Sequence, residues 1–319
     1  MKIVITGGAG FIGSNLVKKL IYEGHEITVI DNFSTGSIRN LHDLKNVKIV
    51  NADLKDVDLY KLDLVGADIL YHLAANADVR DGFLHPQKDI EENILVTSIL
   101  MEEIVKAKIS NIIFSSTAAC LGEPSTFPTP ENIDFPKQTS LYGMSKAACE
   151  GILSAYAEKY NLNVAVFRFV SVVGPNYSHG HIYDFVKKLK QNSRKLQILG
   201  DGNQRKSYLH IDDVISGLLL VSEDLLTWRK GTYQVYHIGN NNYCTVNQSA
   251  TWISEAMGLS PVFKYTGGLR GWVGDSPFVF LSTKKLEKMG WLPAINLERA
   301  IKLTTKWLLS NDWIFDERK

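Results

Sequence analysis

Tyr142 and Lys146 are two side chains that could transfer a proton together, because they lie four residues apart in the segment YGMSK. If this segment is helical, the spacing puts the phenol and the ammonium on one face. A neighbouring cation favours the phenolate and lowers the phenol pKa, so that Tyr142 could take a proton from a hydroxyl. The same spacing recurs at Tyr183 and Lys187, and spacing alone does not distinguish a catalytic pair from a surface pair.

The segment before Tyr142 favours the first pair. An apolar run over 111–115 predicts a strand, and it leads into a Ser-Ser-Thr sequence that ends at Thr117. Ligands of open α/β sheets bind at the carboxyl ends of the parallel strands. The hydroxyl of Thr117 is therefore expected beside the helix that carries Tyr142 and Lys146.

The chain opens with a phosphate-binding pattern. A short β-branched run precedes Gly7, Gly10 and Gly13 in TGGAGFIG, where a helical period begins. Such glycines allow a tight turn, close approach of the backbone to a pyrophosphate, and close packing of the helix on the sheet. Asp31 ends the next predicted strand, near the place about 20 residues further on where an acid binds a ribose. Because a carboxylate there repels a 2′-phosphate, we predict NAD rather than NADP.

Two further charged residues lie near this pattern. Asp53 follows the third predicted strand, where it could contact an adenine or cap a turn, and both roles stay open. Arg39 is a nearby cation, which we interpret as a solvated loop residue rather than a clamp for a 2′-phosphate.

The elements that must position these residues alternate between short apolar runs and longer segments of helical period. Continuous apolar strands separated by helices predict a parallel sheet covered on both faces, that is, a Rossmann-type, doubly wound α/β fold. The predicted strands are 2–6, 26–30, 47–50, 68–73, 111–115 and 163–169, and the predicted helices are 11–23, 86–107 and 140–160.

After about Gly174 the pattern changes to shorter elements with Gly, Asn and Pro turns. We predict an NAD-binding domain over 1–170 and a smaller α/β substrate-binding domain over 171–319. Segments near 210–240 are expected to return to the first domain, so that the two are interleaved.

Composition excludes some classes of protein. The net charge of +1 over 319 residues lacks the basic field of a non-specific nucleic-acid or anionic-membrane binder. No apolar run approaches the roughly 20 residues of a membrane span, and three cysteines without a Cys-x-x-Cys pair favour reduced thiols in a cytoplasmic protein. His179 and His181 have no third ligand in view, so no metal site is predicted.

The chain resembles the extended short-chain dehydrogenase/reductase family of nucleotide-sugar epimerases and dehydratases, most closely its UDP-glucose 4-epimerases. The resemblance lies in segments 6–13, 31–33, 72–75, 115–117, 142–146 and 200–202. It implies Tyr142 as the base, Lys146 as a ligand of the nicotinamide ribose, and Thr117 as a bridge between sugar O4 and the phenol. It also implies a homodimer formed through helices 86–107 and 140–160. The residues that would contact NAD are Gly7, Gly10, Phe11, Ile12, Gly13, Asp31, Asn32, Asp53, Leu54, Leu73, Ala74, Ala75, Asn93, Ser115, Tyr142 and Lys146.

The implied reaction inverts C4 of a UDP-sugar through a transient 4-keto sugar, with NAD held tightly throughout. Dehydratases and uronate decarboxylases of the family carry an acid directly after the catalytic Thr or Ser, whereas Thr117 is followed by two alanines. This argues against a 4,6-dehydratase, and the NAD preference indicated by Asp31 argues against a 4-keto reductase. The intact Tyr142 and Lys146 argue against a non-catalytic NAD-binding protein. Cys120 is interpreted as a buried structural thiol.

The resemblance also implies contacts to the nucleotide sugar. Arg270, in RGWVGD, matches a phosphate-binding arginine, and its planar fork suits a diphosphate. Either Arg205 or Lys206, after GDG, would supply a second cation, and Ser171 stands where relatives carry an asparagine. Val279 stands where relatives restricted to plain hexoses carry tyrosine, which implies room for UDP-GlcNAc or a uronate.

Overall fold

The computed structural model describes residues 1–79, 81–134, 136–271 and 275–317. The chain divides into two compact units. The first comprises Met1–Gly122, Glu131–Phe169 and Ile215–His237, and the second comprises Glu123–Pro130, Val170–Val214 and Ile238–Lys319. Which ligand each unit binds stays a prediction.

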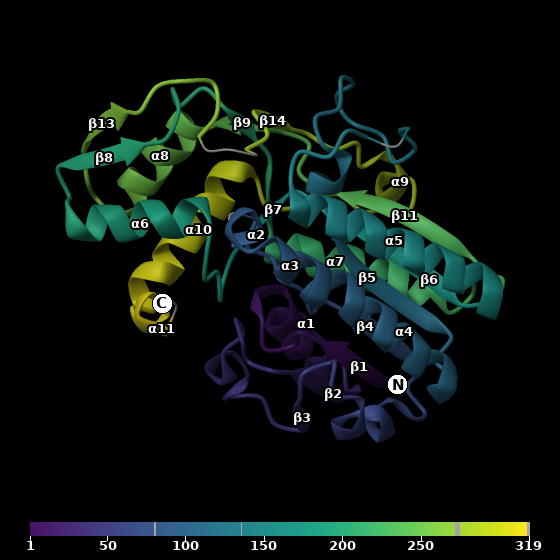
Figure 1. Ribbon diagram of the computed structural model, residues 1–319. Helices are drawn as coiled ribbons and strands as arrows, with labels where there is room; N and C mark the ends of the chain where they lie inside the picture. The colour runs from purple at the N-terminus through teal and green to yellow at the C-terminus, as the bar shows by residue number, and fades with distance from the viewer. Residues whose placement is uncertain (80, 135, 272–274, 318–319) are drawn as a thin grey trace. The chain divides into compact units, whose positions relative to one another are not determined.

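The first unit is built on a seven-stranded sheet with the order β11-β6-β5-β4-β1-β2-β3, and β1 to β6 pair with one another in parallel (Figure 1). Its inner strands are buried on both faces, which explains their continuous β-branched runs; Ile3, Val4 and Ile5 are all fully buried. The strands are β1 Lys2–Thr6, β2 Glu26–Asp31, β3 Val47–Asn51, β4 Ile69–His72, β5 Asn111–Thr117, β6 Asn163–Phe169 and β11 Tyr233–Ile238.

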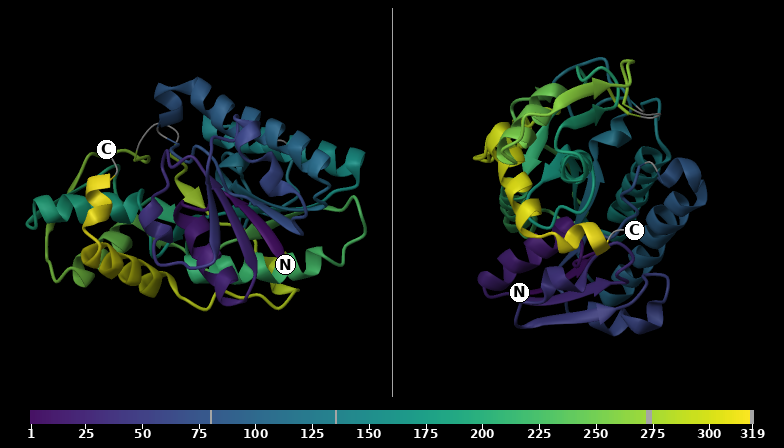
Figure 2. Two further views of the ribbon diagram at one scale, coloured as in Figure 1. Left: turned by 90° about the horizontal axis from the view of Figure 1, so that it is seen from below. Right: turned by 90° about the vertical axis from the view of Figure 1, so that its left-hand side faces the viewer.

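Helices cover both faces of this sheet: α4 and α5 lie on one face and α1 and α7 on the other (Figure 2). The doubly wound α/β prediction is confirmed. The six strands predicted from the sequence all occur, with ends displaced by at most two residues. The helices of this unit are α1 Phe11–Tyr22, α2 Asp81–Leu84, α3 Pro86–Asp89, α4 Val96–Ala107, α5 Leu141–Tyr160 and, shared with the second unit, α7 Ile211–Leu225; the short 3₁₀ turns are η1 Ile38–Leu41, η2 Val57–Leu59, η3 Lys61–Leu64 and η5 Ala118–Leu121.

The predicted continuous helix 86–107 is wrong in one respect. A π-helical turn, η4 (Ile90–Leu95), separates α3 from α4. Such wide turns commonly occur at functional sites. This one contains Asn93, which is buried although its neighbours on both sides are at least partly exposed.

The second unit contains shorter strands in three small sheets, with the orders β10-β7, β12-β9-β14 and β13-β8. Helix α8 begins with a capping box formed by Thr245 and Gln248. Within the described ranges, no helix has the length and apolarity needed to cross a membrane. The elements are β7 Ser171–Val173, α6 His181–Gln191, β8 Lys195–Ile198, β9 Arg205–Lys206, β10 Tyr208–His210, β12 Cys244–Thr245, α8 Val246–Ala256, β13 Val262–Tyr265, β14 Phe278–Val279, α9 Lys284–Glu287, α10 Leu297–Ser310 and α11 Trp313–Glu317.

Candidate active site

The loop between β1 and α1 has the geometry of a phosphate cradle. Gly7 has φ +71°, and a Cβ there would lie 2.6 Å from the backbone nitrogen of Ala74. A Cβ on Gly13 would collide with Gly7 O and lie 2.7 Å from Gly8 Cα. Gly10 caps α1 without a side-chain hydrogen bond, so the helix N-terminus presents backbone rather than a capping side chain. Positive partial charge and room for close approach fit a pyrophosphate.

Asp31 lies at the carboxyl end of β2, beside this loop, and is 8% exposed. Its Oδ2 accepts a hydrogen bond from Ala9 N (2.9 Å), and its Oδ1 accepts one from Phe33 N (2.8 Å). Burial raises the pKa of Asp31, and these two backbone hydrogen bonds oppose the rise. Since each carboxylate oxygen can accept a second hydrogen bond, Asp31 can still bind ribose hydroxyls. Arg39 is exposed on η1.

Asp53 caps a turn, because its Oδ1 accepts from Lys55 N at 2.9 Å. Its Oδ2 also accepts from Asn32 Nδ2 at 3.0 Å, which links the ends of β2 and β3. The adenine contact of Asp53 stays a prediction. The other predicted cofactor residues border the same edge of the sheet: Leu54 is buried after β3, and Phe11, Ile12, Leu73, Ala74 and Ala75 are partly exposed at the start of α1 and after β4.

The structure brings Thr117 and Tyr142 together, and their side chains share a hydrogen bond. Thr117 ends β5, and its Oγ1 accepts from Ala119 N at 3.1 Å. Helix α5 starts after Ser140, whose Oγ accepts from Gly143 N at 3.0 Å. A Cβ on Gly143 would collide with Ala119 O. Glycine at 143 therefore lets α5 approach η5 closely enough to place Tyr142 beside Thr117.

Lys146 lies one turn further along α5 and is 2% exposed. Its ammonium lies 4.2 Å from the centre of the Phe114 ring, a favourable cation–π contact. Burial lowers the pKa of Lys146 to about 8, and electrostatic interactions with nearby groups that include Glu150 oppose this decrease.

The expectation that Lys146 lowers the pKa of Tyr142 is wrong for the protein as the structure shows it. Burial raises the pKa of the Tyr142 phenol, and the hydrogen bond with Thr117 opposes the rise only in part. Desolvation of the phenolate thus outweighs the stabilisation that the Thr117 hydrogen bond gives it. Tyr142 is protonated at neutral pH and needs further positive charge before it can act as a base.

Asn93, predicted as a cofactor residue, has its amide engaged within the protein. Its Oδ1 accepts from Asn76 N at 2.8 Å, and its Nδ2 donates to Ser145 Oγ at 2.8 Å. The π-helical turn therefore ties the loop after β4 to α5 between Tyr142 and Lys146. Direct contact of Asn93 with NAD stays a prediction.

A buried chain of hydrogen bonds, not among the residues predicted from the sequence, connects these elements. His72 Nδ1 lies 2.8 Å from Thr6 Oγ1, and His72 Nε2 lies 3.0 Å from Thr97 Oγ1. Thr97 Oγ1 donates in turn to Cys149 Sγ (3.3 Å) on α5. Burial lowers the pKa of His72 to about 3, so the ring is neutral. Ser115 Oγ donates to His72 O at 3.3 Å, so this predicted cofactor residue is joined to the same strand ends.

In the second unit, β9 and β14 bring several predicted substrate residues together. Val279 pairs in register with Lys206. Lys206 Nζ lies 2.6 Å from Asp275 Oδ1, and Arg270 Nη1 donates to Asp275 O at 2.7 Å. The Arg270 guanidinium also pairs with the carboxylate of Glu123, with Nη2 to Oε2 at 2.9 Å. Residues 272–274 of the RGWVGD motif lie outside the described residues.

Arg205 and Ser171 lie apart from this group of contacts. Arg205 is exposed, and its guanidinium stacks 4.1 Å from the Phe278 ring centre and 5.5 Å from that of Tyr243. Since successive residues of a strand point to opposite faces, Arg205 and Lys206 cannot both face Asp275. Ser171 is exposed on β7, which pairs with β10.

The second Tyr–Lys pair has a packing role. Tyr183 is 5% exposed on α6 and stacks 4.8 Å from the Phe315 ring. Lys187 Nζ lies 5.8 Å from the Tyr183 ring centre. His181, on the same helix, lies 2.6 Å from Ser249 Oγ through its Nε2.

Comparisons with known proteins found a matching family model, related sequences and similar structures. A family model described as the NAD dependent epimerase/dehydratase family matches residues 3–239. The putative UDP-glucose 4-epimerase of Methanocaldococcus jannaschii is 32% identical over 97% of this chain and 99% of the relative. The dTDP-D-glucose 4,6-dehydratase of Mus musculus is 29% identical over 97% of this chain and 89% of the relative. The UDP-glucose 4-epimerase of Thermotoga maritima, solved with UDP-glucose, is 33% identical with a TM-score of 0.87, over 98% of this chain and 99% of that one.

Proposed function

Since the chain belongs to the NAD-dependent epimerase/dehydratase family and is a nucleotide-sugar epimerase, we propose that it inverts C4 of a UDP-sugar. The hydrogen-bonded Thr117 and Tyr142, with Lys146 one turn along α5, carry this proposal. They supply one proton acceptor and donor at one hydroxyl, which is the acid–base chemistry that oxidation and reduction at a single carbon require, with the hydride passing to and from NAD. A dehydratase needs a further acid–base group, and no carboxylate directly follows Thr117.

The chain's own residues hold and move the proton of O4. Thr117 orients the O4 hydroxyl toward the phenol, and Tyr142 removes its proton and later returns it. Lys146 holds positive charge beside the site and binds ribose hydroxyls. Bound NAD supplies the acceptor of the C4 hydride, the donor for its return, and a positive nicotinamide ring that favours the phenolate. The glycine cradle and Asp31 hold the dinucleotide while the 4-keto sugar turns and presents its other face.

Activity is expected to fall as the pH rises through about 8, because burial lowers the pKa of Lys146 to about 8. Below that pH the ammonium is present; above it the charge is lost. In Lys146→Arg the cation does not titrate in this range, so the alkaline decline should disappear from a profile of kcat against pH. An unchanged alkaline decline in Lys146→Arg would assign it to another group.

We propose that Lys206, not Arg205, binds the diphosphate together with Arg270. Lys206→Met is expected to weaken UDP binding by about 10- to 100-fold, because a charge-assisted hydrogen bond is lost and Asp275, which is 8% exposed, keeps an uncompensated charge. Arg205→Met removes an exposed stacked cation and should change UDP affinity little. Titration calorimetry with UDP compares the two variants. Equal losses, or a larger loss in Arg205→Met, contradict this assignment.

The valine at position 279 favours a sugar pocket that accepts a sugar larger than a plain hexose. It pairs with Lys206 across β9 and β14, next to the proposed diphosphate contact. We therefore expect turnover of UDP-GlcNAc or UDP-glucuronate in addition to UDP-glucose.

Proton NMR of each UDP-sugar, incubated with the purified protein without added NAD, tests the proposed function. New anomeric signals of the C4 epimer are the expected result for UDP-glucose. No new signals with any of the three sugars would contradict the epimerase proposal, and a 4-keto-6-deoxy product would favour the dehydratase alternative. If the protein converts UDP-glucose but neither UDP-GlcNAc nor UDP-glucuronate, only the proposal of a larger sugar pocket is contradicted.

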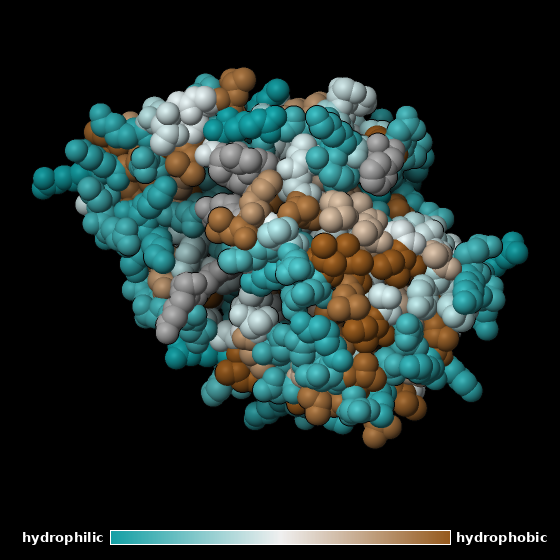
Figure 3. All heavy atoms as spheres, viewed as in Figure 1, coloured by the Kyte–Doolittle hydropathy of each residue, from teal (hydrophilic) through white to brown (hydrophobic). Residues whose placement is uncertain are grey.

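We propose a homodimer that uses α4 and α5. Figure 3 shows apolar side chains gathered on the face of the first unit formed by these helices. On α5, Ala155 and Tyr160 are exposed and Ile152 and Tyr156 are partly buried, and Leu95, directly before α4, is exposed. A second copy of the chain would cover this surface.

A further inference from the structure

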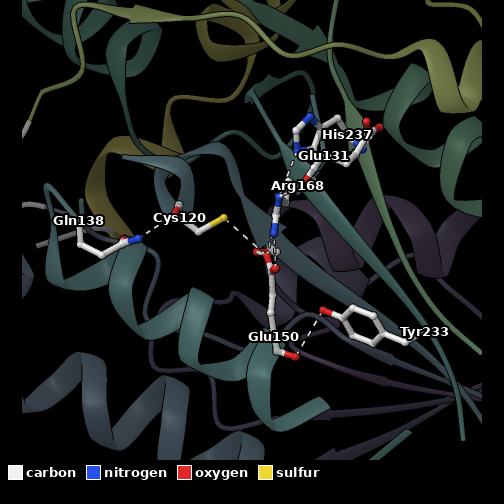
Figure 4. Close-up of polar contacts among 8 residues, drawn as sticks. Cys120, Glu131, Gln138, Glu150, Arg168, Tyr233 and His237 are labelled. Carbon is white, nitrogen blue, oxygen red and sulfur yellow. Dashed lines mark hydrogen bonds and ion pairs between the residues drawn. The ribbon is translucent and has the colours of Figure 1, made fainter. Parts of the chain in front are cut away.

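A network of charged and polar side chains centres on the carboxylate of Glu150 (Figure 4). Glu150 on α5 is 6% exposed, and Arg168 on β6 meets its carboxylate side-on, with Nε to Oε1 at 3.0 Å and Nη2 to Oε2 at 2.7 Å. Arg168 Nη1 also donates to Glu131 O at 3.1 Å and lies 3.4 Å from His237 Nε2. The mechanism proposed above uses none of these groups.

Glu150 also holds the segment around Thr117 from both sides. Its Oε1 accepts a hydrogen bond from Ser116 Oγ, on the residue directly before Thr117. The same oxygen accepts from Cys120 Sγ at 3.6 Å, from the η5 turn that follows Thr117. Cys120 is buried, as predicted, and burial together with Glu150 raises the pKa of its thiol to about 12, so the thiol is a hydrogen-bond donor at neutral pH.

The position of Glu150 on α5 links this network to the proton-transfer residues. Tyr142, Lys146 and Glu150 follow one another at intervals of four residues, so they lie along one face of the helix. One end of that face bears the phenol that is hydrogen-bonded to Thr117. The other end bears the carboxylate that holds Ser116 and Cys120. Through this face, α5 is hydrogen-bonded to Thr117, to Ser116 before it and to Cys120 after it.

We propose that Glu150 is a positioning residue of the C4 epimerisation: its carboxylate, fixed by Arg168, holds Ser116 and Cys120 and thereby sets Thr117 opposite Tyr142. This inference rests on the proposed function, because it assigns Glu150 a role in the same proton transfer. A small displacement of a reacting group can cost about 100-fold in rate. A carboxylate held by a bidentate arginine is a stiff support for that geometry.

The negative charge of Glu150 has a second effect, on Lys146. Burial lowers the pKa of Lys146, and Glu150 opposes that change. Removal of the charge should lower the pKa of Lys146 further and move the alkaline decline in activity to lower pH. The titratable groups that interact electrostatically with Lys146 are Cys149 and Glu150 on α5, His72 on β4 and Cys120 on η5, and its ammonium also lies over the Phe114 ring on β5. His72 is neutral and the two thiols are protonated, which leaves Glu150 as the anion of this group.

Glu150→Gln tests the inference. Glutamine keeps the shape of the side chain but has no charge, and its amide turns an N–H donor toward Arg168 or Ser116, which also donate. We expect kcat for the UDP-sugar to fall by about 100-fold, with little change in KM and in the amount of NAD that copurifies. The alkaline decline in kcat should move to lower pH.

A second variant separates positioning from stability. Loss of one partner from a buried ion pair destabilises a protein, whereas replacement of both partners by well-packed hydrophobic side chains of similar volume is often neutral or stabilising. Glu150→Met combined with Arg168→Met should therefore unfold near the wild-type temperature and still have the low kcat and the displaced pH profile. Glu103→Gln is the matched control: Glu103 is 7% exposed and pairs with Lys106 Nζ at 2.6 Å, both on α4, and its loss should leave kcat and the pH profile unchanged.

Two results would overturn the inference alone: wild-type kcat and pH profile in Glu150→Gln, or recovery of both when the double variant recovers stability. A wild-type protein that converts no UDP-sugar would overturn the proposed function, and the inference would fall with it.

Discussion

Tyr142→Phe is expected to lower kcat for UDP-sugar epimerisation by about 100- to 10,000-fold, the range that a positioned proton donor and acceptor contributes. The substitution removes only the hydroxyl that is hydrogen-bonded to Thr117. The ring remains, so α5 should keep its position and the protein should keep its bound NAD. Initial rates measured by NMR or by a coupled assay, together with the NAD released on denaturation, give both quantities.

Tyr183→Phe is the matched control, because Tyr183 and Lys187 repeat the spacing of the catalytic pair on α6. Tyr183 packs against Phe315 in the second unit. Removal of the Tyr183 hydroxyl should leave kcat within about twofold of the wild type, since no proton transfer depends on this hydroxyl. Similar losses in the two variants, or an active Tyr142→Phe, would contradict the role of Tyr142.

Gly13→Ala is expected to abolish NAD retention. The new Cβ would collide with Gly7 O and approach Gly8 Cα to 2.7 Å, and both of these atoms belong to the backbone. The loop must move to relieve the clash, which disrupts the cradle at the start of α1 and the packing of this helix. We expect purified Gly13→Ala to contain little NAD per chain and to show no epimerase activity without added cofactor.

Gly151→Ala provides the control for this substitution. Gly151 is exposed on α5, and a Cβ there would meet no atom within 4 Å. Alanine is favoured over glycine inside a helix by roughly 0.5–1 kcal/mol, so this variant should be slightly more stable and fully active. If Gly13→Ala retains NAD as Gly151→Ala does, the cradle assignment is wrong.

The sequence was sufficient to predict six of the seven strands of the sheet and the meeting of Thr117 with Tyr142. Both depend on local signals: apolar strands, and a Ser-Ser-Thr sequence at the carboxyl end of one strand that is followed by a helix. The choice between Arg205 and Lys206 depends on strand register, since the two point to opposite faces of β9. A two-residue strand has too short a pattern to reveal that register.

Features that depend on burial and on tertiary packing could not be predicted in the same way. The rise of the Tyr142 pKa follows from desolvation, which no spacing reveals. The π-helical turn around Asn93 coincides with hydrogen bonds that its amide makes with Asn76 and Ser145, partners distant in sequence. Glu150 had one visible signal, its four-residue interval after Lys146, but its partner Arg168 lies on strand β6, and the spacing does not reveal that contact.

The most direct test of transient oxidation at C4 follows the hydrogen on that carbon. UDP-glucose with deuterium at C4 is incubated with the purified protein in ordinary water, and the product is examined by mass spectrometry and NMR. We predict UDP-galactose that retains deuterium at C4, because the hydride removed from the sugar returns to the same carbon. Epimerised product that has exchanged its deuterium for solvent hydrogen would contradict it.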